Sequence, residues 1–118
     1  MPNLQKEAAI WIFLKQGFLS VVADRDNPDR LLVRARVARH IQQVFPSADV
    51  FTDDSADYHY RSFISRQTAA DTISDSVRRI DYDNFKDAVV SESMHTALMS
   101  VWVVMRNLQD KLLGRTNV

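Results

Sequence analysis

The C-terminal third of the chain carries a long apolar stripe, which limits the folds that the sequence can adopt. Six apolar side chains recur at spacings of four, three, four, three and four residues: Met94, Leu98, Val101, Met105, Leu108 and Leu112. This is the heptad pattern of a helix that buries one face. Trp102 and Val104 widen the stripe beyond what a solvent-facing helix carries. We therefore expect a long helix, capped by Ser91, whose apolar face is covered by the core of the same chain or by a second protein. The residues expected at such an interface are Met94, Leu98, Val101, Trp102 and Met105.

Composition excludes several classes of protein. The 118 residues contain no cysteine, which excludes disulfide scaffolds, thiolate metal sites and thiol catalysis. The chain has only two glycines, so it lacks the glycine-rich loops that hold nucleotide phosphates. The 15 basic and 15 acidic side chains cancel, which excludes a strongly basic coat protein and a strongly acidic DNA mimic. The length predicts one domain over residues 1–118, for which we expect no cofactor.

Neither of the apolar runs near the two ends has the features of a membrane span. The run Ile10–Leu14 is bracketed by Glu7 and Lys15, is too short to cross a bilayer and lacks the cleavage site of a signal peptide. We therefore expect a cytoplasmic protein that makes no contact with membranes.

The first half of the chain reads as strands followed by a helix. The β-branched and aromatic segment Phe18–Ala23 predicts a strand, and Asp24–Asp29 predicts a turn. The stretch from residue 31 to residue 45 has two interpretations. It is either one helix starting near Pro28, or a strand Leu31–Arg36 followed by a shorter helix that Pro46 terminates. We favour the strand, because Phe18–Ala23 needs a neighbour with which to pair.

The second half begins with a hairpin and continues as helices. Ala48–Thr52 and Tyr58–Ser65 have strand composition and are separated by the polar turn Asp53–Asp57. A helix is expected from Gln67, with Thr68 as its N-cap. This helix is expected to bury one stripe of residues: Ala69, Ile73, Val77 and Ile80. A turn at residues 81–86 and a short helical piece ending near residue 90 precede the last helix.

These elements predict an α+β fold, in which helices cover one face of a four-stranded antiparallel sheet. If the first two strands pair as a hairpin, the order matches a ferredoxin-like sandwich whose last strand has moved to the front. The extra C-terminal helix then covers the second sheet face or forms a dimer seam.

Charge is unevenly distributed along the chain. Four arginines and no carboxylate lie between residues 30 and 48, and four aspartates and no base lie between residues 49 and 57. In a strand, Arg34 and Arg36 share one face, to which the neighbouring strand adds either His59 and Arg61 or Tyr58 and Tyr60, depending on register. Arginine and tyrosine on an open sheet hold phosphates and stack bases in single-stranded RNA binders. The candidate binding residues are Arg34, Arg36, His59, Tyr60 and Arg61. The alternative is that the arginines form surface ion pairs with the aspartates.

Other candidate sites have weaker support. Asp53, Asp54 and Asp57 are interpreted as turn residues, because the mid-loop glycine and terminal glutamate of a calcium loop are missing. No histidine has a second ligand at metal-binding spacing, so no metal site is expected. His59 with Asp57 or with Tyr60 is a conceivable acid–base pair.

Five segments of the chain form an ordered pattern: residues 11–13, 17–22, 32–36, 58–61 and 82–86. The pattern includes an aromatic start, a glycine, a Ser-Val-Val strand, a Val-Arg-Ala-Arg segment and a Tyr-x-Asn-Phe-Lys turn. In this pattern the chain resembles a family of small uncharacterised bacterial proteins. The resemblance covers most of residues 11–108. It implies a bacterial or mobile-element origin and one compact domain, and it implies no activity. The polar or aromatic positions that carry it are Arg34, Arg36, Tyr60, Arg61, Tyr82, Asn84 and Lys86.

The sequence therefore favours a small non-enzymatic binding domain, which engages phosphates of single-stranded nucleic acid or of a nucleotide through an arginine and tyrosine face. A protein-interaction or homodimerisation module that uses the C-terminal helix is the alternative. A small metal-independent nuclease or hydrolase is a further alternative.

Overall fold

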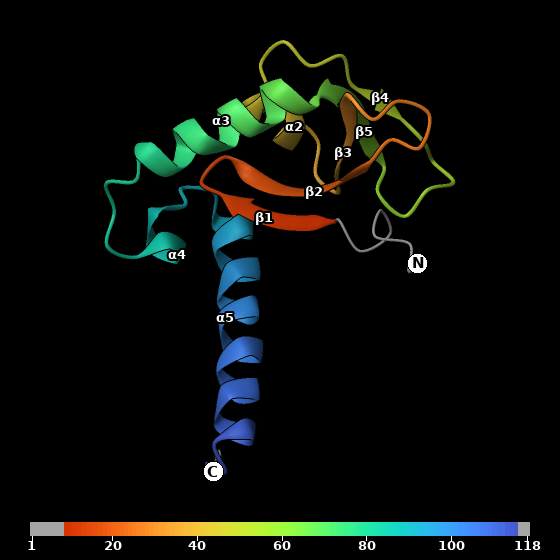
Figure 1. Cartoon of the computed structure of the whole chain (residues 1–118). Helices are drawn as coiled ribbons and strands as arrows, with labels where there is room; N and C mark the ends of the chain where they lie inside the picture. The colour runs from red at the N-terminus through yellow and green to blue at the C-terminus, as the bar shows by residue number, and fades with distance from the viewer. Residues whose placement is uncertain (1–8, 116–118) are drawn as a thin grey trace. The chain divides into compact units, whose positions relative to one another are not determined.

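The computed structural model describes residues 9–115, which form two compact units (Figure 1). The first unit extends to Asp81 and the second begins at Tyr82. The elements of the first unit are β1 (Ile10–Leu14), β2 (Gly17–Ala23), β3 (Arg30–Ala35), α2 (His40–Val44), β4 (Phe51–Thr52), β5 (Tyr60–Ser65) and α3 (Arg66–Arg78). Those of the second unit are α4 (Phe85–Ala88) and α5 (Glu92–Leu112).

The fold is α+β, as expected, and its sheet is antiparallel throughout, but it has five strands rather than four. Their order is β1-β2-β3-β5-β4. The additional strand is β1, which pairs with β2 from Ile10 opposite Val21 to Leu14 opposite Gly17. The segment Ile10–Leu14 is apolar at every position, so it lacks the polar alternation that marks a half-buried strand.

The ambiguous stretch after Pro28 forms a strand and then a short helix, in agreement with the favoured interpretation. β3 pairs with β2 on one side and β5 on the other, so its backbone groups are satisfied within the sheet. Other boundaries differ from expectation: the Ala48–Thr52 strand shortens to β4 and the Tyr58–Ser65 strand to β5. Ser65, not Thr68, is the N-cap of α3, because its Oγ accepts the backbone N–H of Thr68 at 3.0 Å.

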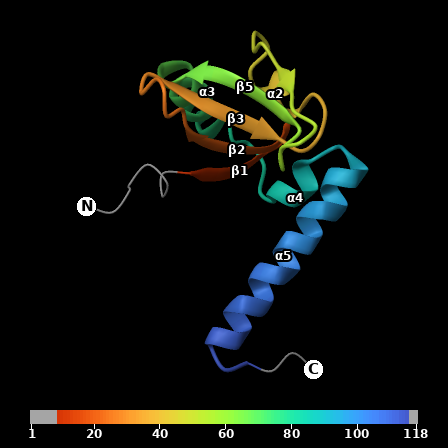
Figure 2. The same ribbon diagram turned by 90° about the vertical axis from the view of Figure 1, so that its right-hand side faces the viewer.

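The core of the first unit lies between one face of the sheet and helices α2 and α3 (Figure 2). The strands contribute Leu19, Val21, Val33, Ala35 and Ile64, and the helical side contributes Ile41, Val44, Phe45 and Ala69. Of the stripe expected on α3 only Ala69 is buried, whereas Val77 and Ile80 are exposed.

The second unit contains the long helix that the apolar stripe predicts. Ser91 caps α5, because its Oγ accepts the N–H of Met94 at 3.4 Å, and Gly114 follows the helix in the left-handed conformation at φ 72°. Leu98 and Val89 are buried, whereas the stripe from Val101 onward is exposed. Within residues 9–115, no helix is long and apolar enough to cross a membrane.

His40 packs against the start of β2, in close contact with the backbone of Gly17. Its Nδ1 accepts the backbone N–H of Phe18 at 3.1 Å, and its side chain is buried. A Cβ atom at Gly17 would lie 2.4 Å from the His40 ring. The absence of a side chain at Gly17 therefore allows this histidine to dock.

Gly17→Ala should destabilise the protein by about 1–3 kcal/mol, because the added methyl overpacks the His40 ring. The midpoint of urea unfolding measures the loss. In a double-mutant cycle, His40→Ala should relieve part of it, so that the double variant is more stable than the sum of the two losses predicts. Additive losses of unfolding free energy would contradict a clash between the added methyl group and the His40 ring.

Acidification should destabilise the protein through His40. Burial lowers the pKa of His40. The unfolded chain therefore binds a proton more readily, and the stabilisation is present above the unfolded pKa of about 6.5. It is lost as the pH falls through 6.5 toward the lowered folded pKa. His40→Asn, which keeps an acceptor near Nδ1 but does not titrate, should show a smaller loss of unfolding free energy between pH 7 and pH 5. Equal losses would contradict the role of His40.

Candidate functional site

A row of directly opposed residues crosses all five strands on the sheet face opposite the core. Trp11 pairs with Ser20, Ser20 with Arg34, Arg34 with Arg61, and Arg61 with Phe51. Directly opposed residues in antiparallel strands point to the same face, so these five side chains form one line. We call this line the arginine row. With strands about 4.8 Å apart, it spans about 19 Å.

Exposed aromatic rings lie at both ends of the arginine row. Trp11 is 70% exposed at one end and Phe51 is 42% exposed at the other. Phe51 stacks against Phe63 with ring centres 5.6 Å apart, and Phe63 is itself 43% exposed. The Arg30 guanidinium lies 4.0 Å from the centre of the Phe63 ring. Aromatic faces are therefore accessible on either side of the central arginines.

The two central arginines of the row lack a carboxylate partner. Arg34 donates to Ser20 Oγ at 2.7 Å, and Arg61 donates to the Tyr58 carbonyl oxygen at 3.3 Å. Within residues 9–115, neither guanidinium lies within 4 Å of a carboxylate oxygen. Like charges directly across a sheet repel each other. This pair is therefore a position at which an anion would be stabilised.

Arg34 is the more enclosed of the two. Burial lowers the pKa of its guanidinium and the charge of Arg61 lowers it further, against opposing effects of Tyr58 and Asp57. Its Nε atom is buried and makes no hydrogen bond to any residue that the structure describes. Because arginine stays protonated at neutral pH, this side chain holds a partly desolvated positive charge.

Tyr58 lies between two arginines. Its buried ring has the Arg34 guanidinium 4.5 Å from its centre and the Arg36 guanidinium 4.0 Å from it. Arg36 also binds the Asp57 carboxylate through two hydrogen bonds of 3.0 and 3.1 Å, which hold the pKa of Asp57 below its usual value. Within residues 9–115, Arg36 therefore forms a salt bridge, whereas Arg34 and Arg61 feel Asp57 and Asp53 only at longer range.

The structure brings together only part of the predicted binding set. Arg34 and Arg61 are opposed, and Arg36 lies beside them at Tyr58. The placement of Tyr60 on the same face is wrong: it is opposite Ala35 and packs against the core. Adjacent strand residues point to opposite faces of a sheet, so Arg61 and Tyr60 cannot both lie on the face that carries Arg34.

His59 pairs with a carboxylate other than Asp57, the partner considered in the conceivable acid–base pair. Its Nδ1 lies 3.1 Å from the Asp54 carboxylate, and its ring is edge-on to Tyr60. Asp57 is already engaged by Arg36. The turn interpretation of the aspartates is confirmed at Asp53, whose carboxylate accepts the N–H and the hydroxyl of Ser55.

Sequence reasoning missed Trp11, Phe51 and Phe63 as members of this face. Trp11 precedes the core-side residue Ile12 and Phe63 precedes the core residue Ile64, but the neighbours of Trp11 are all apolar, so its alternation is not visible in the sequence. The missing information was the register, because the row exists only when β1 pairs with β2 and β4 with β5.

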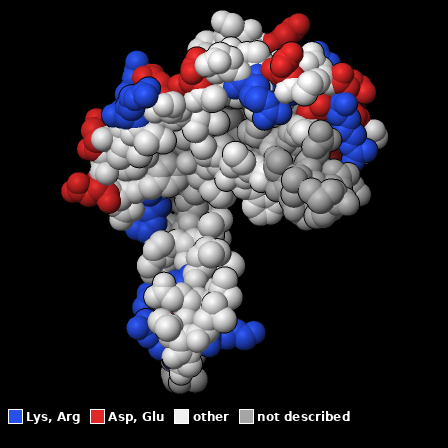
Figure 3. Space-filling view, in the orientation of Figure 1, with Lys and Arg blue, Asp and Glu red and all other residues white. Residues whose placement is uncertain are grey.

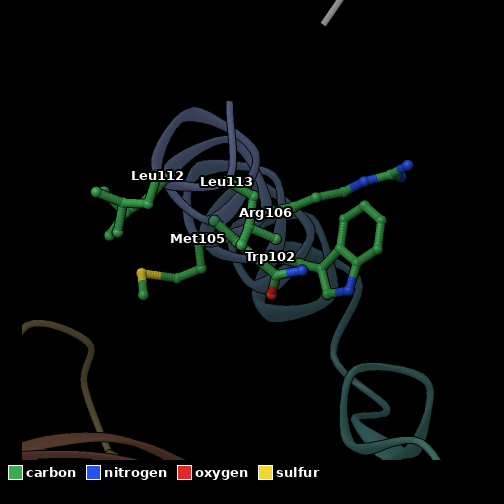
Figure 4. A pocket seen from close by; sticks show the side chains of 7 residues that line it. Trp102, Met105, Arg106, Leu112 and Leu113 are labelled. Carbon is green, nitrogen blue, oxygen red and sulfur yellow. The ribbon is translucent and has the colours of Figure 1, made fainter. Parts of the chain in front are cut away.

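A second surface lies along α5, where apolar side chains are exposed. Figure 3 shows α5 as largely uncharged, with Lys and Arg toward its C-terminal end. An open depression along the helix is lined by side chains from Trp102 to Leu113. Figure 4 shows Met105 and Leu112 pointing to one side of the helix and Arg106 beside Trp102. The Arg106 guanidinium lies 5.2 Å from the centre of the Trp102 ring.

Comparison of the chain with protein-family models, with curated proteins and with solved structures finds no match. The functional assignment therefore depends on the geometry of these two surfaces.

Replacing Arg61 by Gln should raise the unfolding free energy at low ionic strength by about 0.2–1 kcal/mol, because it removes the repulsion from Arg34. The gain should shrink as salt screens the two charges. Arg36→Gln is the matched control and should act in the opposite direction, since it breaks the pair with Asp57. Urea unfolding at two salt concentrations measures both effects. A loss of stability in Arg61→Gln at low salt would show that the arginine pair is not repulsive.

Proposed function

We propose that the arginine row of the first unit binds single-stranded nucleic acid. Backbone phosphates lie against Arg34 and Arg61, while bases stack on Trp11 at one end and on Phe51 and Phe63 at the other. The observation that carries this proposal is an opposed arginine pair that forms no salt bridge within residues 9–115 and lies between two exposed aromatic ends. The proposed function is binding and includes no chemical reaction.

The energetics of the face favour an anionic ligand. Guanidinium groups bind phosphate through charge-assisted, often bidentate hydrogen bonds. A phosphate placed between Arg34 and Arg61 turns their mutual repulsion into attraction for a shared anion. The buried Nε of Arg34 belongs to a side chain whose charge is already partly desolvated, so binding removes little further water from it.

The aromatic ends favour a nucleic-acid strand over inorganic phosphate. Stacking of bases on aromatic rings is sequence-tolerant and contributes about 1–3 kcal/mol per base. The span of about 19 Å from Trp11 to Phe51 separates the two stacking positions by more than one nucleotide. A connected strand can therefore use both ends and the central arginines at once.

The strand order supports a ferredoxin-like assignment, which forms part of this proposal. β2, β3, β5 and β4 lie in that order, with α2 following β3 and α3 following β5. This is the order of a ferredoxin-like sandwich whose last strand has moved to the front, extended by β1 at the β2 edge. In such a sandwich the helices cover one sheet face, and the other face is available to a ligand.

Tryptophan fluorescence provides the test. The chain has two tryptophans, so Trp102→Phe leaves Trp11 as the only reporter. In this background, titration with a single-stranded oligonucleotide at low salt should quench Trp11 saturably, and affinity should fall steeply with salt. Arg34→Gln with Arg61→Gln should weaken binding. The same double variant should reduce the slope of log affinity against log salt by about 0.7 for each phosphate that the protein no longer neutralises.

The matched control is Arg66→Gln with Arg79→Gln, which removes the same charge from α3 and its C-terminal end. Equal weakening by both double variants would overturn the assigned face, as would the absence of binding at low salt. If inorganic phosphate competes fully and the oligonucleotide binds no more tightly than phosphate, the ligand of this face is a small phosphate compound rather than nucleic acid. Trp11→Ala removes the reporter, so its binding is measured by the fluorescence anisotropy of a labelled oligonucleotide. It should weaken binding of the strand about 5- to 150-fold while leaving stability almost unchanged, because this ring is mostly exposed.

A further inference from the structure

Helix α5 presents an apolar seam that remains exposed within the described part of the second unit. The exposed fractions of the seam residues are 38% for Val101, 56% for Met105, 45% for Leu108 and 76% for Leu112. Trp102 and Val104, on either side of the seam, are 45% and 63% exposed. A continuous apolar patch of this kind on a protein surface marks an interaction site. We propose that the seam pairs with the same seam of a second copy of this chain, with the two helices antiparallel.

The spacing of the seam makes it complementary to itself. When two copies of α5 run in opposite directions with Val101 level with Leu112 of the other, Met105 is level with Leu108 of the other. All four layers then place apolar against apolar, alternating positions a and d as helix pairs require. The seam begins at Val101 because Leu98, one turn earlier, is already buried.

Charge complementarity favours a second copy of this chain as the partner of α5 and favours the antiparallel direction. Residues 82–92 carry three carboxylates and one lysine, a net charge of −2, whereas residues 106–115 carry three bases and one carboxylate, a net charge of +2. In the antiparallel register, Arg115 of one copy is level with Leu98 of the other. It therefore lies one turn from His95, which pairs with Asp87 of α4 at 3.3 Å. The basic end of each helix thus lies toward the acidic segment of the other copy and away from its basic end.

A parallel pair would place the two basic ends side by side. In the antiparallel register, the two Arg115 residues are about 25 Å apart along the axis, which exceeds a screening length of about 8 Å. The helix dipoles are also opposed in this arrangement, which is favourable. The pairing is independent of the proposed nucleic-acid function, because it concerns only the second unit.

Light scattering on the full chain across a dilution series tests the pairing. The expected molar mass at high concentration is twice 13.6 kDa. Met105→Glu with Leu108→Glu should reduce it to one chain, with helical circular dichroism retained, because both side chains are exposed in the single chain. Val103→Glu is the matched control: Val103 is 43% exposed on the helix face opposite the seam and should leave the dimer intact. A mass of one chain at every concentration would overturn the proposal, as would equal dissociation by both charge insertions.

Disulfide cross-linking tests the direction of the helices separately. The chain contains no cysteine, so an introduced cysteine is its only thiol. Under mild oxidation, Val101→Cys mixed with Leu112→Cys should give a cross-linked heterodimer, since the two positions are level across an antiparallel pair. Neither variant alone should cross-link. Cross-linking of each variant with itself would show a parallel pair and overturn the antiparallel assignment.

Discussion

Strand β3 lies at the centre of the sheet, and the register of its two ladders determines which side chains reach each face. Val33 is fully buried opposite Val21 on one side and Ser62 on the other. Once Val33 is fixed in the core, Arg34 must point to the opposite face. Shifting β3 by one residue would expose Val33 and bury Arg34 among apolar side chains. The burial of one valine therefore fixes the position of the arginine row.

This constraint has an energetic consequence on the other face. The same ladder that buries Val33 places Arg34 directly opposite Arg61, although like charges in that position repel. Arg36, two residues further along, forms a salt bridge with Asp57, whereas no carboxylate of residues 9–115 lies within 4 Å of the guanidinium of Arg34 or Arg61. A repulsive pair that is maintained by the core is a natural position for an anion, and this observation motivates the nucleic-acid proposal.

The two units carry surfaces of different character. The first combines guanidinium groups with aromatic rings on a sheet, a chemistry suited to phosphates and bases. The second presents aliphatic and methionine side chains on one helix, a chemistry suited to another apolar helix. Most of the stability of a helix in a protein comes from packing of its apolar face rather than from propensity, so coverage of the apolar face of α5 should contribute to its stability. Two copies joined through α5 would also supply two arginine rows, which increases avidity for a longer strand.

Several features can be predicted from the sequence because they depend on local patterns. The heptad spacing predicts α5, Ser91 predicts its cap, and the turn residues around Asp53 predict the hairpin of β4 and β5. The need of one strand for a partner favours a strand over a helix from Arg30 to Ala35. In contrast, β1 could not be predicted, because a short run that is apolar at every position shows neither the hydrophobic period of a strand nor that of a helix. The cap of α3 is equally ambiguous, since Ser65 and Thr68 are both hydroxyl residues near the same helix start.

The sequence by itself determined the chemistry available to this protein: four arginines between residues 30 and 39, four aspartates between residues 49 and 57, no cysteine, and one long amphipathic helix. Only the tertiary structure decided which of those groups meet. Whether Tyr60 or Arg61 joins Arg34 depends on a register that shifts by single residues, and local propensity does not distinguish such shifts. Trp11 and Phe51 lie far apart in the sequence and join the same row only through ladders that cross the whole sheet. The physical reason is that strand pairing is a long-range interaction, fixed by the burial of one face.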